Sequence, residues 1–239
     1  MRRTVLVVLT MALVPACAFA VDGQVLINQS TLNAAGGTYT ITQPGSYKLS
    51  GNLQVKDENT TAIVVAADNV TIDLNGFSIL GPTVCVGTPA ICSPVGTGNG
   101  VDGGTHNSIT VINGNVRGMG HSGIFLGGNS SYGVFLGGAG GYVERVHADS
   151  NGFNGITVGI GGTVSGNTTN SNGSWITNWA TGITAGKGST VSGNTSNFNT
   201  VVGIVAFCPS SVVGNTATGN VGNLTLSGTG CAVANNAAP

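Results

Sequence analysis

A ten-residue segment occurs twice with nearly the same letters, and this repetition limits the possible folds more than any other feature of the sequence. TVSGNTTNSN begins at Thr163, and TVSGNTSNFN begins at Thr190. The underlying pattern, an apolar residue three positions before an asparagine, ends again at Asn215 and at Asn236, with spacings of about 21 residues. Such periodicity is typical of solenoids, in which each repeat packs only on its neighbours.

A second sequence motif recurs with the same spacing as the first. Gly-Ile pairs place isoleucine at 156, 183 and 204, each eight residues before a repeat valine. Short runs such as VTIDL, SITVI and GITVG alternate with period two, which predicts strands, and the Gly-Asn pairs between them suit tight corners. Helical periodicity is limited to a short turn expected at 29–35. We therefore predict an all-β, single-stranded parallel β-helix with one coil of about 21 residues per repeat.

A leucine-rich repeat of similar length is the alternative, but its leucine framework does not occur in this sequence. In a β-helix, neighbouring coils lie about 4.8 Å apart, so equivalent residues form columns along the stack. One column is expected to be an asparagine ladder in which each amide bonds the next, interrupted at Val146. Its predicted members are Asn115, Asn167, Asn194, Asn215 and Asn236.

The segments VTIDLNGFSILG, VINGNVRGMGHSGI and the GI…TVSGNT units resemble secreted bacterial parallel β-helix proteins of the pectate-lyase-like superfamily. The resemblance covers 69–239 and implies a right-handed coil. It is nearly silent about chemistry, because that superfamily includes polysaccharide lyases, glycoside hydrolases, uronate epimerases, adhesins and proteins with no known activity. We expect residues 69–239 to form the repeats and 21–68 to form an N-terminal cap with the first coils.

Residues 1–20 have the features of a signal peptide. Arg2 and Arg3 precede an apolar stretch at 5–15, and Ala18-Phe19-Ala20 matches a cleavage site, so a secreted or periplasmic protein beginning at Val21 is expected. Cys17, after Val-Pro-Ala, leaves open an alternative in which a lipoprotein is anchored through this cysteine. No later segment of the sequence predicts a transmembrane helix.

Charge is scarce, at 6% of residues against about 25% in ordinary soluble proteins. A net charge of −1 provides no basic stripe for nucleic acid. The apolar content of 41% is too high for a disordered Gly/Ser linker. No motif predicts a cofactor, and the spacing of His and Cys predicts no metal site.

Four cysteines follow the predicted signal peptide. Cys85 and Cys92 share one proline-rich insertion, and the separation of Cys208 from Cys231 is close to one coil. Pairing across several coils exceeds the Cα separation that a disulfide allows, so we predict the bridges 85–92 and 208–231. Free thiols are the alternative.

Titratable residues concentrate in the middle of the repeat region. Arg117, Glu144, His147 and Asp149 are weak candidates for an acid–base or uronate-binding site; the alternative is a surface ion cluster that aids solubility. Repeat alignment predicts no column of carboxylates, although most glycosidases need two close together. A polysaccharide lyase or hydrolase that uses these candidates is therefore the second hypothesis.

The long repeat between Val164 and Val191 carries six extra residues near NGSWITNWATG, which contains both tryptophans of the chain. Insertions in solenoids form loops on one face, and exposed indole rings stack well on sugars. Trp175 and Trp179 are therefore predicted to bind carbohydrate, although they could instead shield the coil. The leading hypothesis is an exported protein that binds polysaccharide without catalysis; a purely structural surface protein is a third.

Overall fold

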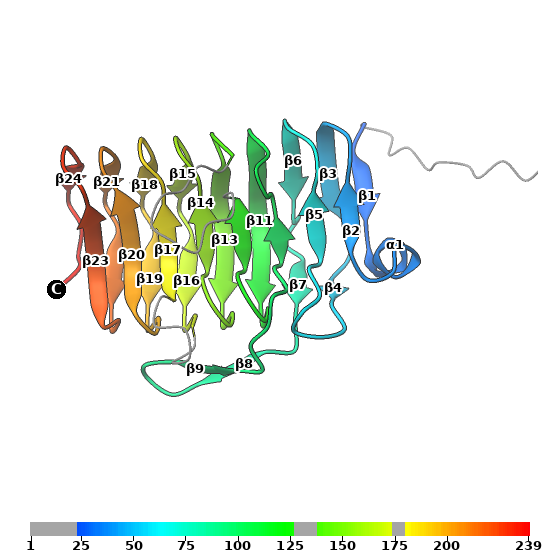
Figure 1. Cartoon of the computed structure of the whole chain (residues 1–239), viewed down its shortest axis with the longest axis horizontal. Helices are drawn as coiled ribbons and strands as arrows, with labels where there is room; N and C mark the ends of the chain where they lie inside the picture. The colour runs from blue at the N-terminus through cyan, green and yellow to red at the C-terminus, as the bar shows by residue number, and fades with distance from the viewer. Residues whose placement is uncertain (1–22, 127–137, 174–179) are drawn as a thin grey trace, which may run out of the picture.

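The computed structural model describes residues 23–126, 138–173 and 180–239, and these form one stack of parallel coils (Figure 1). All strand pairs between coils are parallel, and they build two long sheets along the stack, which we call sheet A and sheet B. The predicted fold class, a parallel β-helix, is confirmed. In a typical coil the chain passes through a first strand of sheet A, a corner, a second strand of sheet A, another corner, and then a strand of sheet B.

The strands of each sheet are given in stacking order. The first strands of sheet A are β1 (Val25–Ile27), β3 (Gly45–Leu49), β6 (Val70–Asp73), β11 (Ile109–Arg117), β13 (Tyr142–Asp149), β15 (Thr163–Ser165), β18 (Thr190–Ser192), β21 (Ser211–Val213) and β24 (Ala232–Ala234). Its second strands are β4 (Leu53–Gln54), β7 (Ser78–Leu80), β16 (Thr168–Asn170), β19 (Thr195–Asn197) and β22 (Thr216–Thr218); β11 and β13 are long enough to serve as both. Sheet B contains β2 (Tyr39–Ile41), β5 (Ile63–Val65), β10 (Val101–Asp102), β12 (Ile124–Leu126), β14 (Ile156–Val158), β17 (Thr181–Ala185), β20 (Val202–Phe207) and β23 (Gly222–Ser227).

The core is the interior of the stack, filled by inward side chains that repeat in register. The repeat valines pair from Val143 through Val164, Val191 and Val212 to Val233, and the isoleucines of the Gly-Ile pairs align in sheet B. The first end of the stack carries α1 (Gln29–Ala34), which buries Leu32 and is capped by the Asn28 side chain. This helix forms where the sequence predicted a short turn.

Corners are made by residues in the left-handed conformation, which repeat as columns. The first corner has positive φ at Asn113, Arg145, Gly166, Gly193, Gly214 and Asn235; the second has it at Gly118, Ser150, Ser171, Phe198 and Gly219. The residue after each left-handed residue is directed back into the stack. In the later coils that residue is asparagine at both corners, which creates two ladders.

The first ladder joins Asn167, Asn194, Asn215 and Asn236. Each accepting asparagine Oδ1 receives bonds from both the backbone and the side chain of its neighbour, at 2.9–3.0 Å. A second ladder, not predicted, joins Asn151, Asn172, Asn199 and Asn220 in the same way. Its signal in the sequence is an asparagine five positions after each of three members of the first ladder. The duplicated ten-residue segment thus encodes one rung of each ladder.

Assigning Asn115 to the first ladder is wrong by one residue. Gly114, not Asn115, pairs with Val146, while Asn115 pairs with His147 on the outer surface. The corner requires its left-handed residue at Asn113, which aligns with Arg145, and this sets the register. A Cβ atom at Gly114 would clash with the Leu74 Cβ, so the interior there has no room for an asparagine.

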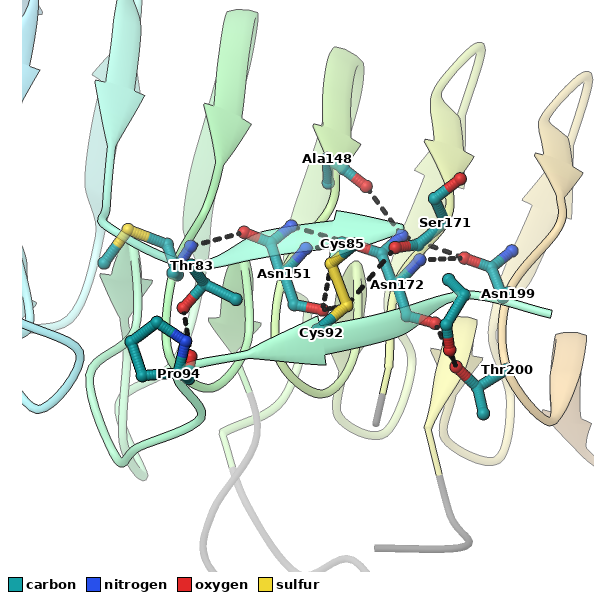
Figure 2. Close-up of a disulfide and its surroundings, with 12 residues drawn as sticks. Thr83, Cys85, Cys92, Pro94, Ala148, Asn151, Ser171, Asn172, Asn199 and Thr200 are labelled. Carbon is teal, nitrogen blue, oxygen red and sulfur yellow. Dashed lines mark hydrogen bonds between the residues drawn. A yellow bond between two sulfur atoms is a disulfide. The ribbon is translucent and has the colours of Figure 1, made fainter. Parts of the chain in front are cut away.

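Both predicted disulfides, 85–92 and 208–231, are present. The first closes the antiparallel hairpin of β8 (Val84–Val86) and β9 (Ile91–Ser93), which lies across several coils beside the second asparagine ladder (Figure 2). Thr200 donates to the Ala90 carbonyl at 2.8 Å, and Thr83 donates to the Pro94 carbonyl at 2.6 Å. The hairpin therefore ties coils that are distant in sequence. In the described residues no helix is long and apolar enough to cross a membrane.

Candidate functional site

A row of polar side chains faces outward from the second half of β11 and β13. Strand alternation points Val116 and Ala148 into the core and leaves Asn115, Arg117, His147 and Asp149 outside. Asn115 lies opposite His147, and Arg117 lies opposite Asp149. On the preceding coil Ser78 lies opposite Asn115. These five residues line a hollow of about 240 Å³, which we call the sheet A hollow.

The register shift that moves Asn115 out of the ladder also assembles this hollow. Aligned from the predicted ladder, Arg117 and Asp149 are offset by one residue, which places their side chains on opposite faces of the sheet. In the structure they are direct neighbours on adjacent coils. The sequence therefore indicated these residues and their closeness on consecutive coils, but not the register that makes Arg117 and Asp149 direct neighbours. Ser78 and Asn115 were missed as lining residues; alternation with Arg117 was the signal for Asn115.

The electrostatics of the sheet A hollow combine two exposed side chains, Arg117 and His147, with a half-buried carboxyl. Burial raises the pKa of Asp149, while the Asn170 backbone N–H, His147 and Arg117 act in the opposite direction. The Asn170 N–H donates to Asp149 Oδ1 at 2.8 Å. Among the residues that the structure describes, Arg117 forms no ion pair within 4.0 Å, so its guanidinium remains available to a ligand.

Glu144, the fourth candidate, does not line the hollow. It belongs to the first half of β13, before the corner at Arg145, and lies opposite Ile112 and Ser165. Its carboxylate contacts Arg145 Nη1 at 2.7 Å, and Arg145 Nε donates to the Asn113 amide oxygen. Glu144 is thus part of a surface ion pair at the corner, which matches the structural alternative for this residue.

The tryptophan prediction lies outside the described residues. Trp175 and Trp179 fall within 174–179, so their binding role stays a prediction. The residues at either side of this segment, Gly173 and Ala180, are buried in the coil. The predicted signal peptide and Cys17 also lie outside the described ranges.

The chemistry available in the sheet A hollow is that of binding and of a single acid. Asp149 is the only carboxylate among its lining residues. Over 23–126, 138–173 and 180–239, no three His, Cys, Asp or Glu side chains group to hold a metal ion. The hollow therefore offers one cation, one imidazole, one carboxyl and neutral hydrogen-bonding groups.

Comparison with known proteins supports the fold and leaves the chemistry open. No family model matches the chain, and a search of curated proteins found no match. A solved structure described as the catalytic domain of Agl-KA matches with a TM-score of 0.52 and 16% sequence identity. The match covers 87% of this chain but 41% of that one. At this identity the likeness concerns the fold alone.

Proposed function

We propose that this chain is an exported β-helix protein that binds an acidic polysaccharide, with a sugar carboxylate held by Arg117 in the sheet A hollow. The observation that carries this proposal is an exposed arginine without an ion-pair partner among the described residues, set in register against Asp149 and beside His147 and Asn115. In a chain with 6% charged residues, such a grouping on one face needs an explanation.

The groups of the hollow suit a uronate unit. A guanidinium donates two parallel hydrogen bonds to a carboxylate, and such charge-assisted bonds are roughly twice as strong as neutral ones. Asn115 and His147 can donate to ring and hydroxyl oxygens, whereas Asp149 and Ser78 can accept from hydroxyl groups. Repetition of outward polar positions along the stack would let neighbouring coils meet neighbouring sugar units.

Export is part of the same proposal. Residues 1–20 have the composition of a signal peptide, and two disulfides favour an oxidising compartment. We further propose membership of the pectate-lyase-like superfamily, on the segments quoted for that resemblance. The insertion with Trp175 and Trp179 is proposed as an additional sugar contact.

An alternative function, lyase or hydrolase activity on an acidic glycan, is favoured by one observation. Burial raises the pKa of Asp149, which is the direction expected for a catalytic acid. Against hydrolysis, a two-carboxylate mechanism needs a second acid within about 5–9.5 Å, and the hollow is lined by one carboxylate. Binding without turnover is therefore the leading proposal.

The test uses chain beginning at Val21, with polygalacturonate and alginate as acidic probes and dextran as an uncharged control. Arg117→Gln is compared with Lys187→Gln, which removes the same charge from an exposed turn elsewhere. We expect Arg117→Gln to weaken retention of an acidic probe about tenfold or more, as for loss of a charge-assisted hydrogen bond, while Lys187→Gln retains it.

Equal retention by both variants, or no retention of either acidic probe by the unmodified protein, would contradict the proposal. Release of new reducing ends or of unsaturated products from either probe, lost in Asp149→Asn, would instead establish the catalytic alternative.

A further inference from the structure

A second hollow, of about 430 Å³, lies over sheet B and has a different chemical character. We call it the sheet B hollow. Its lining residues are Thr97, Asn99, Asp102, Gly104, Thr105, His121 and Phe125. Asp102 of β10 and Phe125 of β12 are direct neighbours on adjacent coils. Asn99 is 6% exposed, whereas Thr97 and Thr105 are exposed at the rim. Among the described residues, no arginine or lysine belongs to the lining.

Hydrogen bonds fix the protonation pattern of His121. The Asn99 Nδ2 donates to Asp102 Oδ2 at 2.9 Å, and the Asn99 Oδ1 accepts from the Ser122 backbone N–H at 3.0 Å. These two partners determine which end of the amide is oxygen. The same Oδ1 lies 3.0 Å from His121 Nδ1, and the Ser122 hydroxyl oxygen lies 3.2 Å from that nitrogen. Because the amide oxygen can only accept, Nδ1 carries the proton and donates, and the Ser122 hydroxyl oxygen is a second acceptor for it. The neutral ring then holds its lone pair on Nε2.

The imidazole is also held in place by aromatic rings. It stacks on Phe153 with centroids 4.8 Å apart and an interplanar angle of 13°, and it meets the edge of Phe125 at 6.5 Å. Burial lowers the pKa of His121, and the Asp102 carboxylate opposes this shift. No hydrogen bond joins Nε2 to a residue within the described ranges. A fixed, neutral acceptor at the hollow thus lacks a donor among the described residues.

We propose that the sheet B hollow binds an uncharged sugar unit, with His121 Nε2 accepting a hydrogen bond from a sugar hydroxyl and Phe125 packing on the apolar face of the ring. Asp102, whose carboxylate is oriented by Asn99 and by the Gly104 N–H, accepts from a second hydroxyl. The rim threonines offer hydroxyl groups that donate or accept.

The lining discriminates against other ligands. An acidic sugar would meet the Asp102 charge without a cation to compensate it. A metal ion would find two ligand side chains, His121 and Asp102, in a region where no group of three converges among the described residues. Apolar area from Phe125 combined with convergent acceptors is the pattern of a neutral polyhydroxyl ligand. The site is independent of the proposed function of the sheet A hollow.

The experiment measures binding of three uncharged oligosaccharides, cellotetraose, laminaritetraose and maltotetraose, to chain beginning at Val21. Ring-nitrogen NMR of labelled histidine should show the Nδ1-protonated tautomer of His121 in the free protein and a shift of Nε2 on binding. His121→Phe keeps an aromatic ring against Phe153 but removes the acceptor, and Phe125→Ala removes the platform. Each should weaken binding about tenfold or more.

Two further variants keep the result interpretable. Val205→Ser changes the same outward column of sheet B three coils beyond Phe125 and should leave affinity unchanged. Thr105→Val alters only an exposed rim hydroxyl, so folding is not at risk, and a severalfold loss is expected.

Binding by none of the three oligosaccharides, or equal binding by wild type, His121→Phe and Phe125→Ala, would overturn the proposal. Retention of polygalacturonate is measured in the same variants and should persist. A failure of acidic-glycan binding alone would therefore refute the sheet A hollow and not this one.

Discussion

The later coils and the middle coils solve the same corner problem with different residues. In the later coils, glycine takes the first-corner left-handed position at 166, 193 and 214, and the next residue is a ladder asparagine. In the middle coils Asn113 and Arg145 take the left-handed position, and Gly114 and Val146 follow. At the first corner the interior of the middle coils is therefore apolar, whereas that of the later coils is hydrogen-bonded.

On the outer surface the contrast is reversed, because the middle coils carry the more polar side chains there. Opposite His147 the later coils place threonine at 168, 195 and 216, a uniform and uncharged column. The middle coils place Asn115 and His147 in that column, and Arg117 and Asp149 face outward two residues further along. At the first corner the regular region joins its coils through asparagine side chains, whereas the middle region carries its charged groups on the outer surface. This contrast favours the proposal that regular coils maintain the fold and that departures from regularity carry recognition.

The largest expected effect is loss of a ladder rung. Asn194 Oδ1 accepts from the Asn167 backbone and side chain, and its Nδ2 donates to the Val164 carbonyl and to Asn215 Oδ1. Asn194→Ala leaves several buried groups unsatisfied, so we expect a loss of about 3 kcal/mol or more in the free energy of unfolding, measured by chemical denaturation.

Val146→Asn is the matched change in the middle coils. It keeps the Val146 N–H bond to Asn167 and introduces the ladder residue, so a change of less than about 1 kcal/mol is expected. Comparable losses in both variants would remove the distinction between the two regions.

A smaller effect is expected at the first corner. Arg145 has φ of 53° and Gly193, in the equivalent column, has φ of 63°. Arg145→Gly removes the strain of a side chain in the left-handed conformation, which is worth about 1–2 kcal/mol. The change also loses the exposed ion pair with Glu144 and adds conformational entropy to the unfolded chain. We therefore expect a net gain of about 0.5 kcal/mol in the free energy of unfolding. Gly193→Ala should lower the free energy of unfolding by about 1 kcal/mol. The added Cβ would meet no close contact, so only the backbone is strained. Thermal melts of the two variants should move in opposite directions.

The smallest effect concerns pH. Burial raises the folded-state pKa of Asp149, so its contribution to stability is greatest below the unfolded pKa of about 3.9 and is lost as pH rises through the folded value. Asp149→Asn keeps an acceptor for the Asn170 N–H and should melt slightly higher than wild type at neutral pH, with the difference closing in acid.

Asp57 is the control of opposite sign. Hydrogen bonds from the Thr60 hydroxyl and the Asn59 N–H lower its pKa, so its stabilisation is present at neutral pH and lost as pH falls. Asp57→Asn should melt lower than wild type at neutral pH. If the melting temperatures of both variants shift in the same direction, the sheet A hollow does not perturb the pKa of Asp149.

Sequence periodicity was sufficient for the fold because each repeat reuses the same corner and the same core position. The spacing of valine, isoleucine and asparagine predicted the coil and four rungs of one ladder. The positions of the cysteines relative to that coil length predicted both disulfides. It failed at Asn115, because letters alone do not say which of Asn113, Gly114 and Asn115 takes the left-handed position. The second ladder was readable in the sequence as asparagine at a constant offset of five.

The amino-acid sequence by itself determined a parallel stack of coils and its regular columns, since these depend on local strand propensity and on identical residues meeting identical residues. Only the tertiary structure decided which unlike residues meet. A one-residue register set by corner conformation and by the bulk of Leu74 brings Arg117 opposite Asp149. The sheet B hollow likewise depends on Asn99 of one coil meeting His121 and Phe125 of the next, and no repeat pattern encodes these contacts.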